Sequence, residues 1–465
     1  MKRNHCFSYV IGLSLLIYFA GLSYAQSVAL TLEVDRAPKS AKQPSTYDRL
    51  IDPANGMTAD DLVRYAFEHN GELAAARAAI AEARGRWRQA GLKANPMIEA
   101  SGAQAVTSSD NNLMVGVELP LELGGRRRAR ITVAEREIEM KEAEANDFER
   151  RLAAEVRVKY ADAIAAMRNL KFIEDLLEIT RNSHQLIRTR VELGKSAPLD
   201  QNLVWVELNK IDVMRIGFES KTEIAALELK KIIGMSPEEA LRLRDDFDLS
   251  RQPPAQSDAL RRALESRPEL AALRAAESLA AAQAEQARVE GKVDASLFGS
   301  YERMDFGYNI RGFNDKGALV PITGVFNYAK FGLRLTLPLR NKNQGLIEAA
   351  LAAKESARKR QEFAELVVRN EVAAAYARFE RANMARTVYR DRVIDASTRN
   401  LDVLRQAYTL GQKNLLDYIA EQRRFIEVET GYTDLLKENF EALAEIERVA
   451  GMPSAFSEQK MKTGK

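Results

Sequence analysis

The chain has 465 residues, and its 69 lysines and arginines nearly balance its 66 aspartates and glutamates. Charges of the two signs alternate along the sequence instead of clustering, so we expect no nucleic-acid partner. Glycine and proline are sparse, whereas alanine, leucine, glutamate and arginine dominate. This composition favours long helices over the loop-rich architecture of most enzymes.

Residues 1–25 have the three parts of a secretory signal peptide. Lys2 and Arg3 supply the positive end, residues 10–22 the apolar run, and Ala25 ends a small-x-small cleavage site. The apolar run is too short for a membrane helix, and an uncleaved anchor is the alternative. The only cysteine, Cys6, falls in this segment, so the mature chain is expected to lack thiols, which suits an oxidising compartment. No stretch of about twenty apolar residues follows, which argues against a helical membrane span.

Residues 26–56 mix prolines with polar residues and show no period, which predicts a flexible leader. The ordered part is expected to begin near Thr58. Thr58 and Asp61 have capping-box spacing ahead of a helical pattern of apolar residues. A corresponding helix is expected near Asp258.

Two pairs of segments have apolar residues at every second position. We expect strands at about 96–106 and 112–121, and again at about 293–303 and 327–339. In the two clearest segments, 113–121 and 329–339, the apolar residues occupy the odd positions. Each pair predicts a hairpin, the first turning at 107–112 and the second through a long glycine-bearing loop at 304–326.

Long helices are predicted after each hairpin. Residues 126–191 contain no glycine and no proline, so a continuous helix there would reach roughly 100 Å. Apolar residues that include Val156 and Tyr160 step by three or four, as in a coiled-coil seam. Gly194 is expected to end this helix and Pro198 to begin the next one. In the second half Gly411 marks the break.

The two halves share landmarks separated by 217 positions. Leu-Gly at 193–194, Leu-Asp at 199–200 and Gly-Met at 234–235 recur at 410–411, 416–417 and 451–452. A register held over some forty residues indicates a duplicated unit of helix, β-hairpin and long helix pair. We therefore divide the chain into repeats at 57–236 and 258–453, a linker at 237–257 and a tail at 454–465.

The predicted strands have the length of tilted membrane-spanning strands, and their alternation fits lipid on one face and water on the other. Four strands cannot close a barrel, and hydrocarbon does not tolerate open edges, so several chains would have to share one. Two copies would give eight strands and three would give twelve. The alternative is a small soluble sheet packed on the helices.

Two strand-to-helix junctions carry a family resemblance. The stretches 117–127 (VELPLELGGRR) and 337–345 (LPLRNKNQG) resemble the junctions of the TolC family of outer-membrane efflux ducts, in its heavy-metal, CzcC-type branch. The resemblance covers about residues 57–453. Asn70-Gly71 departs from it, because the family usually has Asn-Pro there, whereas Arg267-Pro268 keeps the proline.

The resemblance implies a homotrimer, mainly α with a small β part. Its twelve-stranded barrel in the outer membrane would continue as a coiled-coil helical tunnel across the periplasm. The implied partners are outer-membrane lipid, a periplasmic adaptor protein and an inner-membrane pump of the resistance-nodulation-division type. The turns expected to contact the adaptor are Leu193, Gly194 and Lys195, and Leu410, Gly411 and Gln412.

The resemblance also places a gate near these turns. Asp200 and Asp417 each lie six residues after a glycine, and three-fold symmetry would turn each into a ring of charge that favours cations. The plainer interpretation is that each stabilises a helix N-terminus. Tyr408 and Lys413 would tie neighbouring helices shut. The even-numbered strand positions would face the lumen, and the charged residues there are Glu118, Asp294, Glu302, Lys330 and Arg334.

No pattern indicates catalysis. His69 and His184 lie in helical patterns, so we expect no metal ligands and no cofactor, and Gly124-Gly125 lacks the lysine of a phosphate loop. Arg126, Arg127, Arg128 and Arg130 could meet lipid head groups, although a solvated cluster is the commoner outcome. Two hypotheses remain: a passive efflux duct, or a periplasmic coiled-coil adaptor or scaffold without a pore. For a duct, the junction motifs alone favour heavy-metal cations, and drugs or secreted polypeptides are the alternative.

Overall fold

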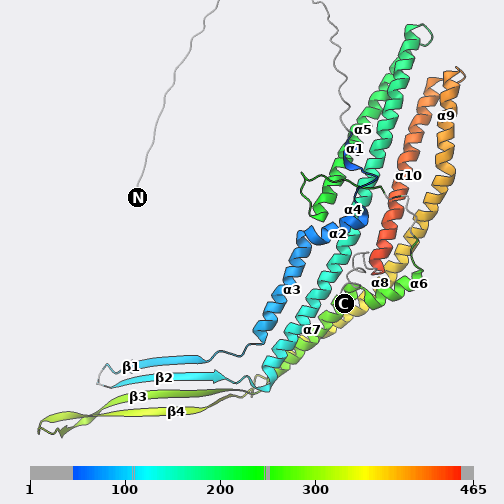
Figure 1. Ribbon diagram of the computed structural model, residues 1–465. Coiled ribbons are helices and arrows are strands. Elements are labelled where there is room, and N and C mark those ends of the chain that lie inside the picture. The colour runs from blue at the N-terminus through cyan, green and yellow to red at the C-terminus, as the bar shows by residue number, and fades with distance from the viewer. Residues whose placement is uncertain (1–44, 107, 109, 246, 248–251, 452–465) are drawn as a thin grey trace, which may run out of the picture. The chain divides into compact units, whose positions relative to one another are not determined.

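The computed structural model describes residues 45–106, 108, 110–245, 247 and 252–451 (Figure 1). The expected signal peptide, residues 26–44 of the expected leader, and the tail at 454–465 lie outside the described residues. The first half contains α1 (Thr46–Leu50), α2 (Ala59–His69), α3 (Gly71–Ala90), β1 (Met97–Gln104), β2 (Asn111–Pro120), the short turn η1 (Leu123–Gly125), α4 (Arg126–Glu192) and α5 (Pro198–Ile233). The second half contains α6 (Gln256–Ser266), α7 (Pro268–Glu290), β3 (Asp294–Phe313), β4 (Leu319–Thr336), α8 (Gln344–Val388), η2 (Tyr389–Ile394), α9 (Asp395–Thr409) and α10 (Leu415–Val449).

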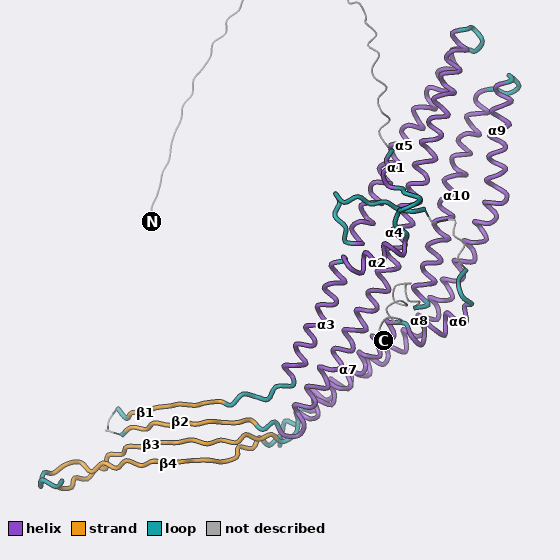
Figure 2. The backbone as a smooth tube through the Cα atoms, viewed as in Figure 1, coloured by secondary structure: helices purple, strands orange, loops and turns teal. Residues whose placement is uncertain are grey.

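Long helices carry most of the chain, and the strands gather in one sheet at the end opposite to the helical turns (Figure 2). Helix α4 runs unbroken for 67 residues. It packs against α3, α5, α7 and α10, so it touches both repeats. Among the residues that the structure describes, no helix is both long enough and apolar enough to cross a membrane.

The duplication is visible in the two helical turns. Gly194 and Gly411 both have left-handed backbone, with φ of +70° and +74°, and the next helices begin at Pro198 and Leu415. A left-handed residue after a helix is most easily a glycine, which explains why both repeats keep one there. The long hairpins of the two repeats differ, because the second contains the π-helical turn η2, where Tyr389 stacks on Tyr432 with ring centroids 6.4 Å apart.

The strands form one antiparallel sheet in the order β1-β2-β3-β4. The expected long loop at 304–326 was wrong, because β3 and β4 pair across most of it and turn only at 314–318. Asn314 closes this turn, since its Oδ1 accepts hydrogen bonds from the backbone N–H groups of Lys316 (3.0 Å) and Ala318 (2.9 Å). Because Asn314 closes the turn in this way, the two strands are joined by a short turn, whereas the glycines had suggested a long loop.

The segment before Thr58 is ordered from residue 45, so the expected leader was wrong for 45–56. Its backbone pairs with the connection between the repeats: Leu243 N–H donates to the Leu50 carbonyl (2.8 Å) and Asp52 N–H to the Leu243 carbonyl (2.9 Å). Leu241 and Leu243 are buried. Apolar residues in the connection thus join the core, and residues 241–245 are packed structure instead of a free linker.

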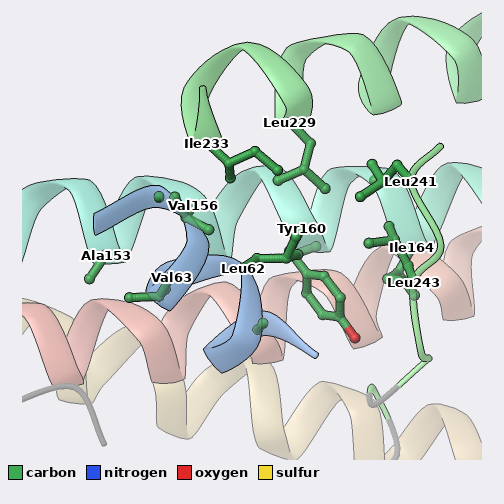
Figure 3. Packing of buried hydrophobic residues seen from close by; sticks show 14 of the residues in the cluster. Leu62, Val63, Ala153, Val156, Tyr160, Ile164, Leu229, Ile233, Leu241 and Leu243 are labelled. Atoms are coloured by element: carbon green, nitrogen blue, oxygen red, sulfur yellow. The ribbon is translucent and has the colours of Figure 1, made fainter. Parts of the chain in front are cut away.

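The main core lies where this connection crosses α4 (Figure 3). Leu62, Val156 and Tyr160 are fully buried there. The Tyr160 hydroxyl donates to the Arg244 carbonyl, and the Tyr376 hydroxyl donates to the Pro254 carbonyl (2.7 Å). The predicted seam on α4 is therefore confirmed as the buried row. In each repeat a buried tyrosine on the long helix after the strands, Tyr160 on α4 and Tyr376 on α8, thus binds the backbone of the connection.

A buried ion-pair cluster joins the repeats near the end of α10. Arg267 is 1% exposed, and its guanidinium lies 2.5 Å from Glu269 and 2.6 Å from Glu371. From the first repeat, Arg150 donates to the Arg448 carbonyl (3.0 Å). A buried guanidinium needs such partners because water cannot solvate it.

The first repeat has Asn70 at the position of Arg267. The Asn70 side chain accepts a hydrogen bond from Leu73 N–H (2.9 Å) and donates to the Ile232 carbonyl (2.8 Å). It caps α3, so the asparagine supplies the helix start that Pro268 supplies in the second repeat.

Glu371→Gln should destabilise the folded protein by about 3 kcal/mol, because it removes one of the two charges that compensate the buried Arg267. The control is Glu362→Gln on the same helix, where the pair with Lys359 is half exposed on both sides and should contribute less than about 1 kcal/mol. Thermal unfolding of both variants, followed by circular dichroism in detergent, checks the difference. Equal stability of the two variants would show that the cluster does not hold the repeats.

Candidate functional site

The strand register sorts the sheet residues onto two faces. Cross-strand pairing aligns Glu118 with Phe298 and Glu302 with Tyr328, so even-numbered residues of β2, β3 and β4 share one face. The opposite face carries exposed apolar side chains: Leu113, Val115, Val117, Leu119, Leu297, Phe331, Leu333 and Leu335. We call these the even face and the odd face.

The even face carries cross-strand ion pairs. Arg334 pairs with Glu118, which also accepts a hydrogen bond from the Ser296 hydroxyl. Lys330 pairs with Glu302, which also accepts from the Asn112 amide (2.8 Å). Four of the five charged residues expected in the lumen thus lie on one face, and each carboxylate is balanced by a cation.

Asp294, the fifth residue, binds the strand-to-helix junction. Its carboxylate accepts a hydrogen bond from Leu123 N–H (3.0 Å) and lies 3.4 Å from Arg126 Nε. Three neighbouring residues, Glu122, Gly124 and Gly125, have left-handed backbone with φ of +49°, +72° and +86°. The glycines therefore turn strand into helix, and Asp294 fastens the turn.

The arginines after this turn also serve the junction. Arg126 donates to the Lys292 carbonyl (2.7 Å), Arg127 donates to the Gly91 carbonyl (2.7 Å), and Arg130 pairs with Glu122 (2.5 Å). Arg126 and Arg130 are thus partly buried against the junction, so a fully solvated cluster was wrong for them, whereas Arg127 is exposed as that cluster predicts. Sequence reasoning missed the role because carbonyl acceptors leave no mark on the sequence.

At the opposite end, the helical turns protrude into solvent. Leu193 and Leu410 are 64% and 74% exposed, and the glycines beside them are exposed as well. Lys195 N–H donates to the Arg190 carbonyl (2.7 Å), and Gln412 N–H donates to the Ala407 carbonyl (2.8 Å). The two turns are thus closed by the same backbone bond and present exposed leucines at matching places.

Asp200 and Asp417 lie in the first turns of α5 and α10. Asn414 caps α10 by accepting from Asp417 N–H (2.8 Å). A carboxylate at a helix N-terminus is stabilising, so the plainer interpretation of both aspartates holds in the folded chain.

Tyr408 is half-buried and connects the two hairpins. Its ring lies 6.2 Å from the Tyr418 ring, centroid to centroid and nearly parallel. Burial raises the pKa of Tyr408, the Asp200 carboxylate raises it further, and Arg190 opposes this. Tyr408 also packs against a buried cluster that includes Ile187 and Val204 of the first hairpin, so it contacts both repeats. Lys413 is exposed, and no ion pair of Lys413 is present among the described residues.

A cavity of about 190 Å³ lies between the two hairpins, next to Tyr408. Ile187 and Val204 line it from the first hairpin and Leu415 from the second. Buried Glu207 pairs with Arg423 (3.0 Å). Sequence reasoning missed this layer, although the spacing of Leu415 and Tyr418 indicates a buried helix face.

The described residues contain no group of three or more histidines, cysteines, aspartates and glutamates that could hold a metal ion.

A model of the family described as outer membrane efflux protein matches residues 62–235 and 259–452. The chain belongs to this family. The two matched stretches correspond to the two copies of the duplicated unit, and the family predicted from the junction motifs is confirmed.

Two curated relatives and one solved structure show how far the likeness extends. The cobalt-zinc-cadmium resistance protein CzcC of Cupriavidus metallidurans is 22% identical over 95% of this chain and 98% of its own length. The nickel-cobalt-cadmium resistance protein NccC of Alcaligenes xylosoxydans xylosoxydans is 33% identical over 37% of this chain and 38% of its own length. The crystal structure of CusC, 16% identical, superimposes with a TM-score of 0.69 over 84% of this chain and 92% of its own.

Membership of the outer membrane efflux protein family confirms the expected fold, location and class. The protein is an outer-membrane efflux channel whose helices extend into the periplasm. Channels of this family are trimeric, work with adaptor proteins and inner-membrane pumps, and are transport ducts instead of enzymes.

We propose that the odd face contacts lipid and the even face water. Val115→Arg should then impair assembly by about 2–4 kcal/mol, because it puts a charge on the lipid face. Met114→Arg, at the same depth on the even face opposite Glu302, should be tolerated. The yield of assembled protein in outer-membrane fractions measures both. Equal damage from the two substitutions would contradict the assignment of the faces.

We also propose that Tyr408 and Lys413 hold the helical end closed, with Asp200 and Asp417 lining it. Tyr408→Phe keeps the ring on Tyr418 but removes the hydroxyl whose pKa the Asp200 carboxylate raises, and Lys413→Ala removes a cation that forms no ion pair among the described residues. The double variant should raise single-channel conductance in planar bilayers while trimer yield stays unchanged. Tyr418→Phe serves as the control for loss of a hydroxyl at the stack. Unchanged conductance with intact trimers would place the constriction elsewhere.

Proposed function

We propose that this channel is the exit duct for divalent heavy-metal cations, from a periplasmic adaptor and a resistance-nodulation-division pump to the exterior. The chain would act as a homotrimer whose three sheets close a twelve-stranded barrel. The single observation that supports a duct is the construction of the four-stranded sheet. Among the described residues its two edge strands each lack a neighbour on one side, one of its faces is apolar and exposed, and the other face is polar with cross-strand ion pairs.

The edges support the trimer. Strands β1 and β4 each have a neighbour on one side only, and unpaired backbone groups are costly in hydrocarbon. Pairing β4 of one copy with β1 of the next removes every edge in the four-stranded part. Three copies give an even strand number and a barrel wide enough to keep an aqueous lumen, since an eight-stranded barrel is already filled by its own side chains.

The proposal that the transported substrates are heavy-metal cations is supported by the relatives and by the charged residues. The two curated relatives are named for resistance to cobalt, zinc, cadmium and nickel. In the proposed trimer, Asp200 and Asp417 would each form a ring of three carboxylates near the helical end, which attracts cations. The even face would conduct without holding them, because Glu118 and Glu302 are already paired with Arg334 and Lys330. Such a wall lets a multivalent cation pass without a deep binding site.

A deletion strain tests the cargo. It should become sensitive to Co²⁺, Zn²⁺, Cd²⁺ or Ni²⁺ but keep its tolerance of drugs, and the wild-type chain should restore growth. Complementation with Val115→Arg, expressed at the same level, should fail because the barrel cannot assemble. Sensitivity to drugs alone would favour the alternative cargo. Recovery of the protein as a soluble periplasmic monomer would contradict the duct.

A further inference from the structure

The β3–β4 hairpin is longer than its neighbours. Strand β2 pairs with β3 only as far as Asp305, whereas β3 and β4 continue to pair with each other up to their turn (Figure 1). Residues 306–325, which we call the ribbon, therefore form two strands that have no strand neighbour on either side among the described residues. Beyond the base of the ribbon, where Gly307 N–H donates to Asp110 (2.5 Å), it extends alone.

In the ribbon the even face changes from polar to apolar. On the face that carries Glu118, Glu302, Lys330 and Arg334 lower down, the register places apolar side chains in and next to the ribbon: Phe306, Tyr308, Val320, Ile322 and Phe326. These side chains are between 37% and 46% exposed. The odd face of the ribbon is mixed, with Asp305 at its base, Arg311 and Thr323 above, and exposed Phe313, Leu319 and Val325 beside them. The even face thus becomes apolar at the level where β1 and β2 end.

The apolar side chains of the ribbon's even face pack against one another, and glycines leave room for them. The rings of Phe306 and Phe326 lie 6.2 Å apart. A Cβ on Gly324 would lie 2.9 Å from the Phe326 ring and 3.3 Å from the Tyr308 ring, so the glycine lets both rings lie across the strand. A Cβ on Gly312 would likewise lie 3.0 Å from Ile322. Two strands with such a face are marginal in water by themselves, and an exposed apolar face of this kind indicates a contact.

The position of the ribbon in the proposed barrel determines what can cover its apolar even face. Under the proposed function the even face looks into the barrel, so lipid on the outside cannot cover it, whereas three-fold symmetry turns three identical faces toward one axis. Twelve strands about 4.8 Å apart and tilted by about 40° give a barrel radius of about 12 Å. Eight residues of ribbon strand span about 26 Å, which is enough to reach the axis. The register shift between Tyr308 and Arg311 supplies a place to bend.

We infer that the three ribbons of a trimer fold over the outer mouth of the barrel and pack their apolar even faces together as a cap. This inference rests on the proposed trimeric duct. The cap closes the outer end by an apolar contact that excludes water and hydrated ions. The outer closure therefore differs in chemistry from the polar ties proposed at the helical end.

Cysteine cross-linking tests the cap in the full-length protein, in a Cys6→Ser background. Ile322→Cys lies on the even face and Thr323→Cys is its neighbour on the odd face. Mild oxidation of outer membranes should link Ile322→Cys into disulfide dimers and leave Thr323→Cys monomeric in denaturing gels, because a disulfide needs Cβ atoms within about 4.5 Å. Equal linkage of the two, linkage of Thr323→Cys alone, or none would overturn the cap.

Conductance in planar bilayers is the second measurement. The double change Phe306→Ser, Phe326→Ser should raise the conductance of purified trimers at least about twofold, because the apolar closure is lost. Phe313→Ser on the odd face, where the ring is 76% exposed, should leave conductance unchanged. Wild-type protein that forms no trimers or channels would contradict the duct itself. Conducting trimers that respond to neither the cysteine test nor the serine test would contradict the cap alone.

Discussion

The two edges of the sheet constrain the rest of the molecule. Among the described residues, strands β1 and β4 each leave one row of backbone N–H and C=O groups without a strand partner. In an outer-membrane protein these groups must pair, because hydrocarbon offers them nothing. A single chain is thus an incomplete unit, and the faces, the junctions and the helices have to be arranged so that further copies fit.

The strand-to-helix junction transmits this arrangement to the long helices. Two left-handed glycines turn the chain at the start of α4, and Asp294 and the following arginines fix the turn by binding backbone groups. Because α4 then continues for 67 residues, a small change of direction at the junction would move its far end by many ångströms. The many hydrogen bonds at the junction therefore fix the direction in which α4 starts, and with it the position of its far end.

The sequence predicted the periodic elements well and the local contacts poorly. The period of two identified four strands, and the glycine and proline positions identified the ends of α4 and α5, because both patterns come from backbone geometry. The π-helical turn η2 went unpredicted, and the stack of its Tyr389 on Tyr432 joins residues that are distant in the sequence. The ordered segment at 45–56 was missed because its partner, Leu243, lies nearly 200 residues away. At the site, four charged residues were placed on one face by alternation alone, whereas the packing of Tyr408 against Ile187 and Val204 of the first hairpin could be seen only once the two hairpins were brought together.

The ion-pair cluster between the repeats has a consequence for the order of folding. Arg150, in the middle of α4, receives its backbone partner from Arg448, 298 positions later and almost at the end of α10. The side chains around Arg267 likewise come from α7 and α8, with Arg448 of α10 next to Glu371. During synthesis α4 can form early by local hydrogen bonds, and α2 and α5 can cover much of its apolar row, but the part of its surface that contacts α10 stays open until the last helix is made. Contacts of such long separation are slow to form, so the surface around Arg150 is the last part of α4 to be covered.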